Sequence, residues 1–370
     1  MTRSTETTRL DSIDALRGFD MFFITGGASL IHALYKACPT SFFGALDAQM
    51  THMTWDGFAF FDMIFPLFLF IAGVSFPFSL AASRRRGLSE RRIVGNILRR
   101  GATLVLLGLV FNGLFRLDFD TMRYASVLGR IGIAWAIAAL AYRATSVRTR
   151  ICTTLGILVG YGVLLATATA PDAPAGASPL SIEGNIVGFV DRHWLPGRLL
   201  DGNFDPLGLL STLPAVATAL LGMFAGDAVR SSRFSEGRRL SMLSGIGLAL
   251  IIIGLLLNPV LPINKPLWSS SYVCFTGGLS MLLFTAFYWI IDVRGWRRWS
   301  FYFRIIGLNS ITIYMLQKIV DLKGVARFFF GGAAKLVPAA WSNMVLAAGY
   351  LIVAYIILHF LYKRKIFLKV

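Results

Sequence analysis

The stretch QMTHMTWDGFAFFDMIFPLFLFIAGVSF, residues Gln49–Phe76, decides the fold class because its second half is a long apolar run. A membrane-spanning helix needs about 20 mostly apolar residues, so this run predicts a transmembrane helix over Gly57–Ala82. The same stretch places His52, Asp56 and Asp62 in or beside the span. Ionisable side chains are costly there and mark functional sites by default.

The composition places the whole chain in the membrane class. Of its 370 residues, 56% are hydrophobic and 15% are charged, whereas soluble proteins carry about 25% charged residues. We therefore predict an all-α polytopic integral membrane protein, with a single transmembrane domain over residues 1–370 and a bundle of about ten helices. The ten predicted spans are Ala15–Tyr35, Gly57–Ala82, Ile97–Phe115, Ser126–Tyr142, Ile151–Ala170, Leu207–Ala228, Leu240–Leu257, Ser270–Ile291, Phe303–Val320 and Ala339–Tyr362.

The basic residues predict the orientation of the chain. The formal net charge is +17, and most Lys and Arg residues share one side of the membrane if the N-terminus is cytoplasmic. Because cytoplasmic segments collect Lys and Arg, we predict both termini in the cytoplasm and a periplasmic loop at about 171–206. The lipid bilayer, not nucleic acid, is then the expected partner. No His or Cys spacing is typical of a metal site, so none is predicted.

His52, Asp56 and Asp62 form the most suggestive polar group. His52 and Asp56 are four residues apart and would share one face of a helix, with Asp62 about one and a half turns deeper. A histidine oriented by a carboxylate can act as a general base near neutral pH. An interfacial histidine, with carboxylates favoured by a helix N-terminus, explains the spacing equally well.

Other polar residues fall into two groups, each with a structural alternative. Arg17, Arg99 and Arg100 lie toward the cytoplasmic side, where they either recognise phosphate or anchor the helices. Arg130, Lys265 and Asn309, with Trp268, lie in or beside later spans and either bind a polar ligand or link helices. Lys265 and Trp268 belong to NPVLPINKPLWSSS, a Pro-rich break of the kind tolerated where it lines a cavity.

Several blocks in order along the chain carry a family resemblance. They are RLDSIDALRGFDMFF, THMTWDGFAFFDMIFPLFLFIAGVSF, YASVLGRIGIAW, FDPLGLLSTLPAVATALLGMFAG, LPINKPLWSSSYVCFTGG and GLNSITIYM. Together they resemble the transmembrane acyltransferases related to heparan-α-glucosaminide N-acetyltransferase, a group that includes bacterial NagX-like proteins.

The resemblance implies transfer of the acetyl group of cytoplasmic acetyl-CoA to the amino group of a glucosamine-like acceptor at the outer side. The acceptor would be an amino sugar or a glucosamine-ended oligosaccharide. His52 in HMTWDG matches the family's active histidine, Asp62 in DMIFPLFLF matches its acidic residue, and Asp56 fills a variable position of the histidine motif. The resemblance further implies a homodimer, and a location in the bacterial cytoplasmic (inner) membrane.

The chain departs from the family pattern at two places. Thr25 stands where the lysosomal relative has an asparagine, and Leu207 stands where family members often have Glu after Asp205-Pro206. With these departures included, the expected contacts to acetyl-CoA are Arg17, Arg99, Arg100, Arg130, Lys265 and Asn309. The expected acceptor or oxyanion contacts are Thr25, Trp55, Asp205 and Trp268.

The sequence leaves the mechanism and the function class open. His52 either acts as a general base in a ternary complex or is itself acetylated first, which would give ping-pong kinetics. Ten spans with Pro and Gly breaks also suit a sugar transporter without acyl transfer. A structural or regulatory membrane protein that has lost activity is the third reading.

Overall fold

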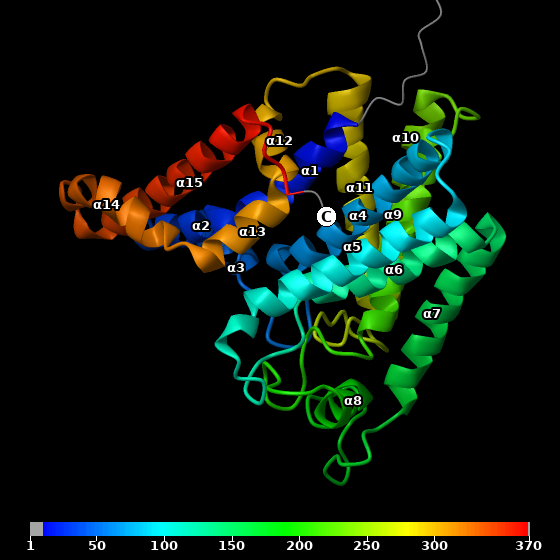
Figure 1. Cartoon of the computed structure of the whole chain (residues 1–370). Coiled ribbons are helices and arrows are strands. Elements are labelled where there is room, and N and C mark those ends of the chain that lie inside the picture. Colours follow the sequence, from blue (N-terminus) through cyan, green and yellow to red (C-terminus); the bar gives the residue numbers. More distant parts are fainter. Residues whose placement is uncertain (1–9, 369–370) are drawn as a thin grey trace, which may run out of the picture.

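A computed structural model of the chain describes residues 10–368, in which helices are the only extended regular elements (Figure 1). The α-helices are α1 Asp11–Phe22, α2 Ala28–Ala37, α3 Ser41–Gln49, α4 Phe60–Arg85, α5 Glu90–Phe111, α6 Val127–Ala144, α7 Val147–Thr167, α8 Ile186–Trp194, α9 Thr212–Arg230, α10 Glu236–Leu257, α11 Ser270–Phe287, α12 Phe301–Leu308, α13 Ser310–Ile319, α14 Leu322–Lys335 and α15 Ala339–Lys363. Three short helical turns are η1 Phe23–Gly27, η2 Leu114–Arg116 and η3 Tyr288–Val293.

The prediction of an all-helical polytopic membrane protein is confirmed. Within residues 10–368, eight helices are long and apolar enough to cross a membrane, and they match eight of the ten predicted spans. They are α4, α5, α6, α7, α9, α10, α11 with its extension η3, and α15.

The other two predicted spans are wrong as continuous helices, because each is broken near its middle. Ala15–Tyr35 divides into α1 and α2 at Gly26, whose φ of 152° lies in a region that glycine tolerates best. Phe303–Val320 divides into α12 and α13 at Asn309, whose φ of −120° and ψ of 26° are not helical. Broken helices are tolerated at membrane depth where the backbone is buried in protein or lines a cavity.

The two broken spans pack closely against each other through glycines. A methyl group at Gly18 of α1 would lie 1.7 Å from the backbone oxygen of Phe303, and one at Gly307 of α12 would lie 1.8 Å from the backbone oxygen of Asp14. Small residues at such crossings let helix backbones approach, which is a principal source of packing energy in a bilayer. The breaks are therefore held inside the protein.

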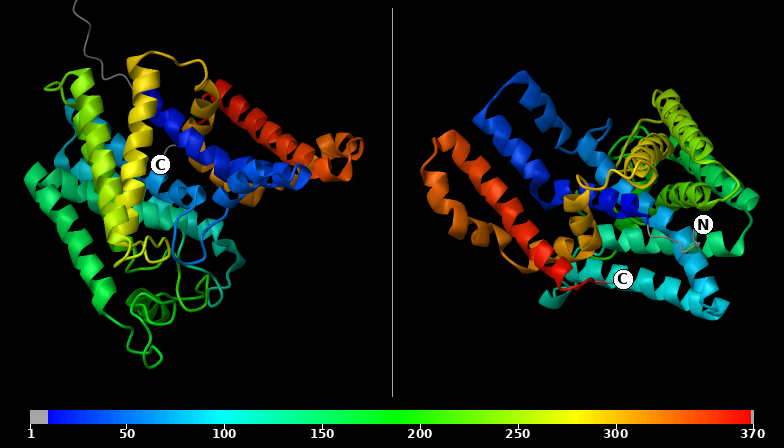
Figure 2. Two further views of the ribbon diagram at one scale, coloured as in Figure 1. Left: turned by 180° about the vertical axis from the view of Figure 1, so that it is seen from behind. Right: turned by 90° about the horizontal axis from the view of Figure 1, so that it is seen from above.

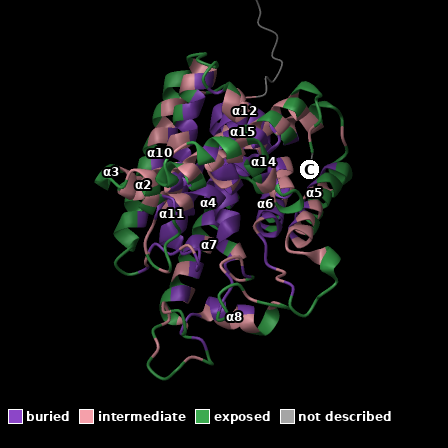
Figure 3. Cartoon of the chain, turned by 90° about the vertical axis from the view of Figure 1, so that its left-hand side faces the viewer, coloured by how far each residue is buried: buried purple, intermediate pink, exposed green. Residues whose placement is uncertain are grey.

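Burial separates a central core from lipid-facing helices. α4 and α9 form the centre, and in each 78% of the apolar window is buried, against 17% for α10 and 22% for α7 and α15. Figure 3 shows this contrast between buried and exposed ribbons. α2, α14 and α15 pack together and extend to one side of the remaining bundle (Figure 2). Apolar residues on the exposed helices are suited to contact lipid.

The connecting segments that carry the candidate site meet at one end of the bundle. Residues 50–59, the long segment containing α8, and residues 258–269 lie together below the helices in Figure 1, away from the start of α1. This arrangement is compatible with an outer loop at about 171–206, while the orientation of the termini stays a prediction.

The α1–α12 crossing gives a direct stability prediction. Gly18→Ala places a methyl group against fixed backbone, so the two helices must separate, and overpacking of this kind costs about 1–3 kcal/mol. Gly156→Ala in α7 is the matched control, because a methyl group there has no neighbouring heavy atom within 4 Å. Thermal unfolding of both variants in detergent checks the prediction; equal melting temperatures would contradict it.

Candidate active site

The segment that carries His52 is a loop and not part of a helix. Residues 50–59 connect α3 to α4, which begins at Phe60. The prediction that His52 and Asp56 share a helical face is therefore wrong. The start of α4 is fixed by Asp62, whose Oδ2 accepts the backbone N–H of Ala59 at 3.1 Å. A carboxylate near a helix N-terminus satisfies otherwise unpaired donors.

His52 and Asp62 form a hydrogen-bonded pair. The Nδ1 of His52 lies 2.7 Å from the Oδ1 of Asp62, whose side chain is fully buried, while 52% of the His52 side chain is exposed. The other oxygen of Asp62 accepts the backbone N–H groups of Met53 and Ala59, so Oδ1 is the one left for the ring. Donation from Nδ1–H leaves the lone pair of Nε2 available for a proton.

Lys265 completes this group from a distant part of the sequence. Its Nζ lies 3.2 Å from the Oδ1 of Asp62, and 2.9 Å and 3.3 Å from the Nδ1 and Nε2 of His52. Burial lowers the pKa of Lys265, and the Asp62 carboxylate opposes that shift. The sequence predicted Lys265, in a Pro-rich break, as a contact to acetyl-CoA, and the structure places its ammonium against the His52–Asp62 pair.

Asp56 and Trp55 join the surrounding loops. Asp56 accepts the Asn264 side-chain amide at 3.1 Å, whereas the carboxylate bonded to His52 is that of Asp62. The indole N–H of Trp55 donates to the backbone oxygen of Leu180 at 2.9 Å, and the ring lies edge-on to Phe204. Both residues therefore fix the frame in which His52 sits. Asn264 had no signal in the sequence beyond its place beside Lys265.

Asp205, another predicted site residue, is held inside the long segment between α7 and α9. Its fully buried carboxylate accepts two hydrogen bonds from Arg123, at 2.7 Å and 2.6 Å. It also accepts the backbone N–H groups of Leu200 and Leu207. The neighbouring Asp191, which the sequence did not single out, accepts backbone N–H groups, and burial raises its pKa to about 6.

Arg130 and Trp268 lie together in the protein interior. The guanidinium of Arg130 stands 5.1 Å from the centre of the Trp268 ring and donates to the backbone oxygen of Gly208 and the hydroxyl of Ser211. The Trp268 indole donates to Thr218 at 3.3 Å. Arg130 donates to residues just before α9 and does not line the cavity shared by Arg17 and Arg100, the arginines of α1 and α5 that were predicted with it.

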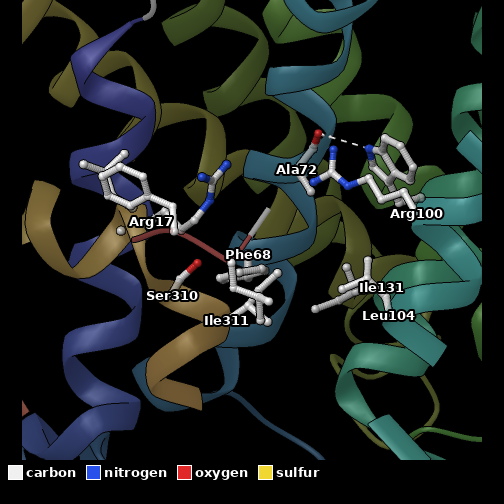
Figure 4. Close-up of a pocket in the computed structure, with 13 residues that line it drawn as sticks. Arg17, Phe68, Ala72, Arg100, Leu104, Ile131, Ser310 and Ile311 are labelled. Carbon is white, nitrogen blue, oxygen red and sulfur yellow. Dashed lines mark hydrogen bonds between the residues drawn. The ribbon is translucent and has the colours of Figure 1, made fainter. Parts of the chain in front are cut away.

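Arg17 and Arg100 line a cavity of about 210 Å³ (Figure 4). They approach from α1 and α5. Arg17 donates to Ser75 at 3.3 Å and lies 3.5 Å from Asp14. The Arg100 guanidinium lies 4.3 Å from the centre of the Trp135 ring, and its Nε has no hydrogen-bond partner in the described part of the chain.

The cavity also includes residues that the sequence did not indicate. Its remaining lining residues are Phe68, Ala72, Leu104, Ile131, Trp135, Gly307, Leu308, Ser310, Ile311, Phe367 and Leu368. Apolar residues are common in every span, so the sequence does not indicate which of them line a cavity. Phe367 and Leu368 reach the cavity only because the C-terminal segment turns back toward the bundle after α15. Arg99 does not line the cavity and is exposed.

Polar side chains without partners gather at the two helix breaks. Thr25, Asn309 and Asp20 are buried, and their polar side-chain atoms have no hydrogen-bond partner within residues 10–368. Arg17 makes its ion pair with Asp14 at 3.5 Å. An unsatisfied buried polar group costs about 1–3 kcal/mol, so these groups are suited to a ligand or to water.

A family model and two named proteins match this chain over much of its length. Residues 9–259 match the family model described as heparan-alpha-glucosaminide N-acetyltransferase, catalytic. The chain is 25% identical over 423 residues to a mouse protein named heparan-alpha-glucosaminide N-acetyltransferase, covering 100% of this chain and 62% of the relative. The human protein of that name is 25% identical over 419 residues, with 98% and 60% covered. The chain thus spans about three fifths of the length of these relatives.

The buried Arg123–Asp205 ion pair joins the α5–α6 connection to the segment between α7 and α9, and protein stability should depend on it. Arg123→Met leaves a buried carboxylate without its cation, which costs about 3–5 kcal/mol. Arg192→Met, in α8 of the segment that contains Asp205, is the matched control, because it breaks a more exposed pair with Asp172 and should destabilise the protein less. Denaturant unfolding of the purified variants measures both losses; similar losses would show that burial of Asp205 does not govern loop stability.

Proposed function

Because the chain belongs to the heparan-alpha-glucosaminide N-acetyltransferase family, we propose that it moves the acetyl group of acetyl-CoA to the amino group of an amino sugar. The observation that carries the proposal is the His52–Asp62 pair, in which a buried carboxylate orients a half-exposed ring at 2.7 Å. Such a ring can take a proton from an attacking amine. A glucosamine-ended oligosaccharide is the proposed acceptor.

The proposed reaction is direct transfer with His52 as general base. The acceptor nitrogen attacks the thioester carbon, and His52 Nε2 takes a proton from that nitrogen. The new C–N bond forms, the C–S bond breaks, and the CoA thiolate leaves and receives the proton held by His52. Asp62 keeps Nδ1 protonated and stabilises the charged ring while it carries the proton. A positioned base of this kind contributes a factor of about 10²–10⁴.

The Arg17–Arg100 cavity is the proposed site for the nucleotide end of acetyl-CoA. The two guanidinium groups bring positive charge to one cavity, and a phosphate group would reduce the repulsion between them. Phosphate oxygen could also accept a hydrogen bond from the Nε–H of Arg100, which has no partner among the described residues. The ring of Trp135 and the apolar residues around it suit the adenine base. Acetyl-CoA is therefore the proposed co-substrate, and no metal is required by the scheme.

We further propose that the pantetheine arm of CoA runs from this cavity along the broken spans toward His52. Ser310 lines the cavity beside Asn309, and α13 packs against η1, which contains Thr25. The pantetheine arm of CoA carries two amide groups, whose donors and acceptors match the unpaired side chains of Thr25 and Asn309. We extend the proposal to a cytoplasmic donor, an acceptor at the outer side and a bacterial inner-membrane location. A homodimer remains part of the same proposal.

His52→Gln provides the first test. With purified protein in detergent, acetyl-CoA, and glucosamine or short glucosamine-ended oligosaccharides, the variant should lower kcat by about 10²–10⁴. Binding of CoA should survive, because His52 does not line the cavity. Release of free thiol measures turnover, and His32→Gln is the control because His32 is also paired with a carboxylate, Asp47, at 2.6 Å.

Three results, from this test and from two companion experiments, would contradict or change the proposal. Full turnover by His52→Gln would remove the histidine from the chemistry. An acetylated protein formed with acetyl-CoA alone would favour prior acetylation of His52 over direct transfer. Sugar flux in proteoliposomes without acetyl-CoA would favour a transporter, a class that also uses broken helices.

Arg100→Gln tests the donor cavity separately. Loss of a charge-assisted hydrogen bond costs about 1.5–3 kcal/mol, so the KM for acetyl-CoA should rise about 10- to 100-fold. Arg99→Gln is the matched control, because Arg99 is adjacent in sequence but its side chain is exposed and does not line the cavity. Initial rates and calorimetric CoA binding provide the measurements. Equal effects of the two substitutions would place the nucleotide elsewhere.

A further inference from the structure

Lys265 is the charged group at the candidate active site that the proposed reaction leaves unused. Its ammonium lies within 3.3 Å of both ring nitrogens of His52 and 3.2 Å from the Oδ1 of Asp62. One carboxylate oxygen therefore faces both the imidazole and the ammonium. This arrangement differs from a simple His–Asp pair, because the base has a cation as its immediate neighbour.

The backbone around Lys265 is held in a fixed turn. Its carbonyl oxygen accepts the N–H of Trp268 at 3.0 Å. The adjacent Asn264 accepts the N–H of Leu267 at 2.7 Å, donates its own N–H to Ser269 at 3.1 Å, and bonds Asp56 through its side chain. Only 17% of the Lys265 side chain is exposed. The ammonium is thus directed at the histidine loop by a structure built from both segments.

The neighbouring charges act on His52 in opposite directions. Asp62 from α4 favours a protonated ring, whereas Lys265 disfavours it, because two cations would then share one carboxylate oxygen. The apolar ring of Phe61 lies 4.8 Å from the His52 ring, measured between the ring centres. Arg130 adds positive potential behind Lys265. The ammonium therefore offsets part of the effect of the carboxylate.

We propose that Lys265 is a positioning residue that keeps His52 unprotonated and so preserves the base that accepts the proton of the attacking amine. The same ammonium repels the charged ammonium form of an acceptor and favours its reactive free amine. This inference rests on the proposed base role of His52. The residue acts through His52 and Asp62, and no bond to substrate is assigned to it.

The first test follows protonation of His52 without using catalysis. Diethylpyrocarbonate reacts with neutral imidazole, so its rate with His52 as a function of pH, read on the His52 peptide by mass spectrometry, reports when the ring loses its proton. In Lys265→Met, protonation becomes easier, and the half-maximal rate should move to higher pH by about one unit. Lys265→Arg should restore most of the original profile.

His32 is an internal control in the same samples. Its Nδ1 is also paired with a carboxylate, the Oδ1 of Asp47, at 2.6 Å, and it lies in α2, outside the loop that Lys265 contacts. Its profile should be the same in all three proteins. An unchanged His52 profile in Lys265→Met, or an equal shift at His32, would overturn the proposal. Calorimetric CoA binding by the variants shows that they remain folded.

The second test asks whether the charge effect matters for transfer. In the pH dependence of kcat/KM, the acidic limb of Lys265→Met should move to higher pH in parallel with the reactivity of His52, and activity should recover toward alkaline pH. A loss of equal size at every pH would assign Lys265 a merely structural role and overturn the inference. Absence of acetyl transfer by the unsubstituted protein would instead contradict the proposed function. The reactivity of His52 with diethylpyrocarbonate does not depend on transfer, so it separates that failure from a failure of the inference about Lys265.

Discussion

The buried carboxylate of Asp62 is the constraint on which the candidate site depends. It is fully enclosed at the beginning of α4, where an uncompensated charge would be costly. Backbone N–H groups of Met53 and Ala59 satisfy one oxygen, and His52 and Lys265 share the other. One residue thus starts a central helix, shapes the preceding loop and brings together the two titratable side chains beside it.

The core of the bundle makes that position rigid. α4 packs closely along α9, and a methyl group at Gly73 or Gly222 would lie within 2.2 Å of backbone oxygen on the opposing helix. The hydroxyl of Tyr272 in α11 donates to the backbone oxygen of Asp62 at 2.6 Å. Tight packing of α4 and the hydrogen bond from Tyr272 therefore fix the position of Asp62, while the side chain of His52 in the preceding loop is half-exposed.

The two broken spans give the site a different kind of environment. A continuous helix satisfies its own backbone and offers few polar groups to a ligand. Thr25 and Asn309 lie at the breaks and Asp20 lies in α1 before the first break, and the side chains of all three are buried without protein partners among the described residues. The Arg17–Arg100 cavity is next to the second break, because Ser310, which follows Asn309, lines it. The proposed transfer uses both features, with charge at the cavity and polar side chains along the path.

The sequence by itself determined the membrane class, the positions of eight continuous spans, the family, and His52, Asp56 and Asp62 as candidate site residues, without deciding which acid bonds His52. These depend on local composition and short spacing, which a single segment contains. Only the tertiary structure decided that the helix begins after His52, that two spans are broken, and that Arg130 lies apart from Arg17 and Arg100. It also brought Lys265 to an acid 203 positions away in the chain, because a contact at that separation depends on how the helices pack and not on any local pattern.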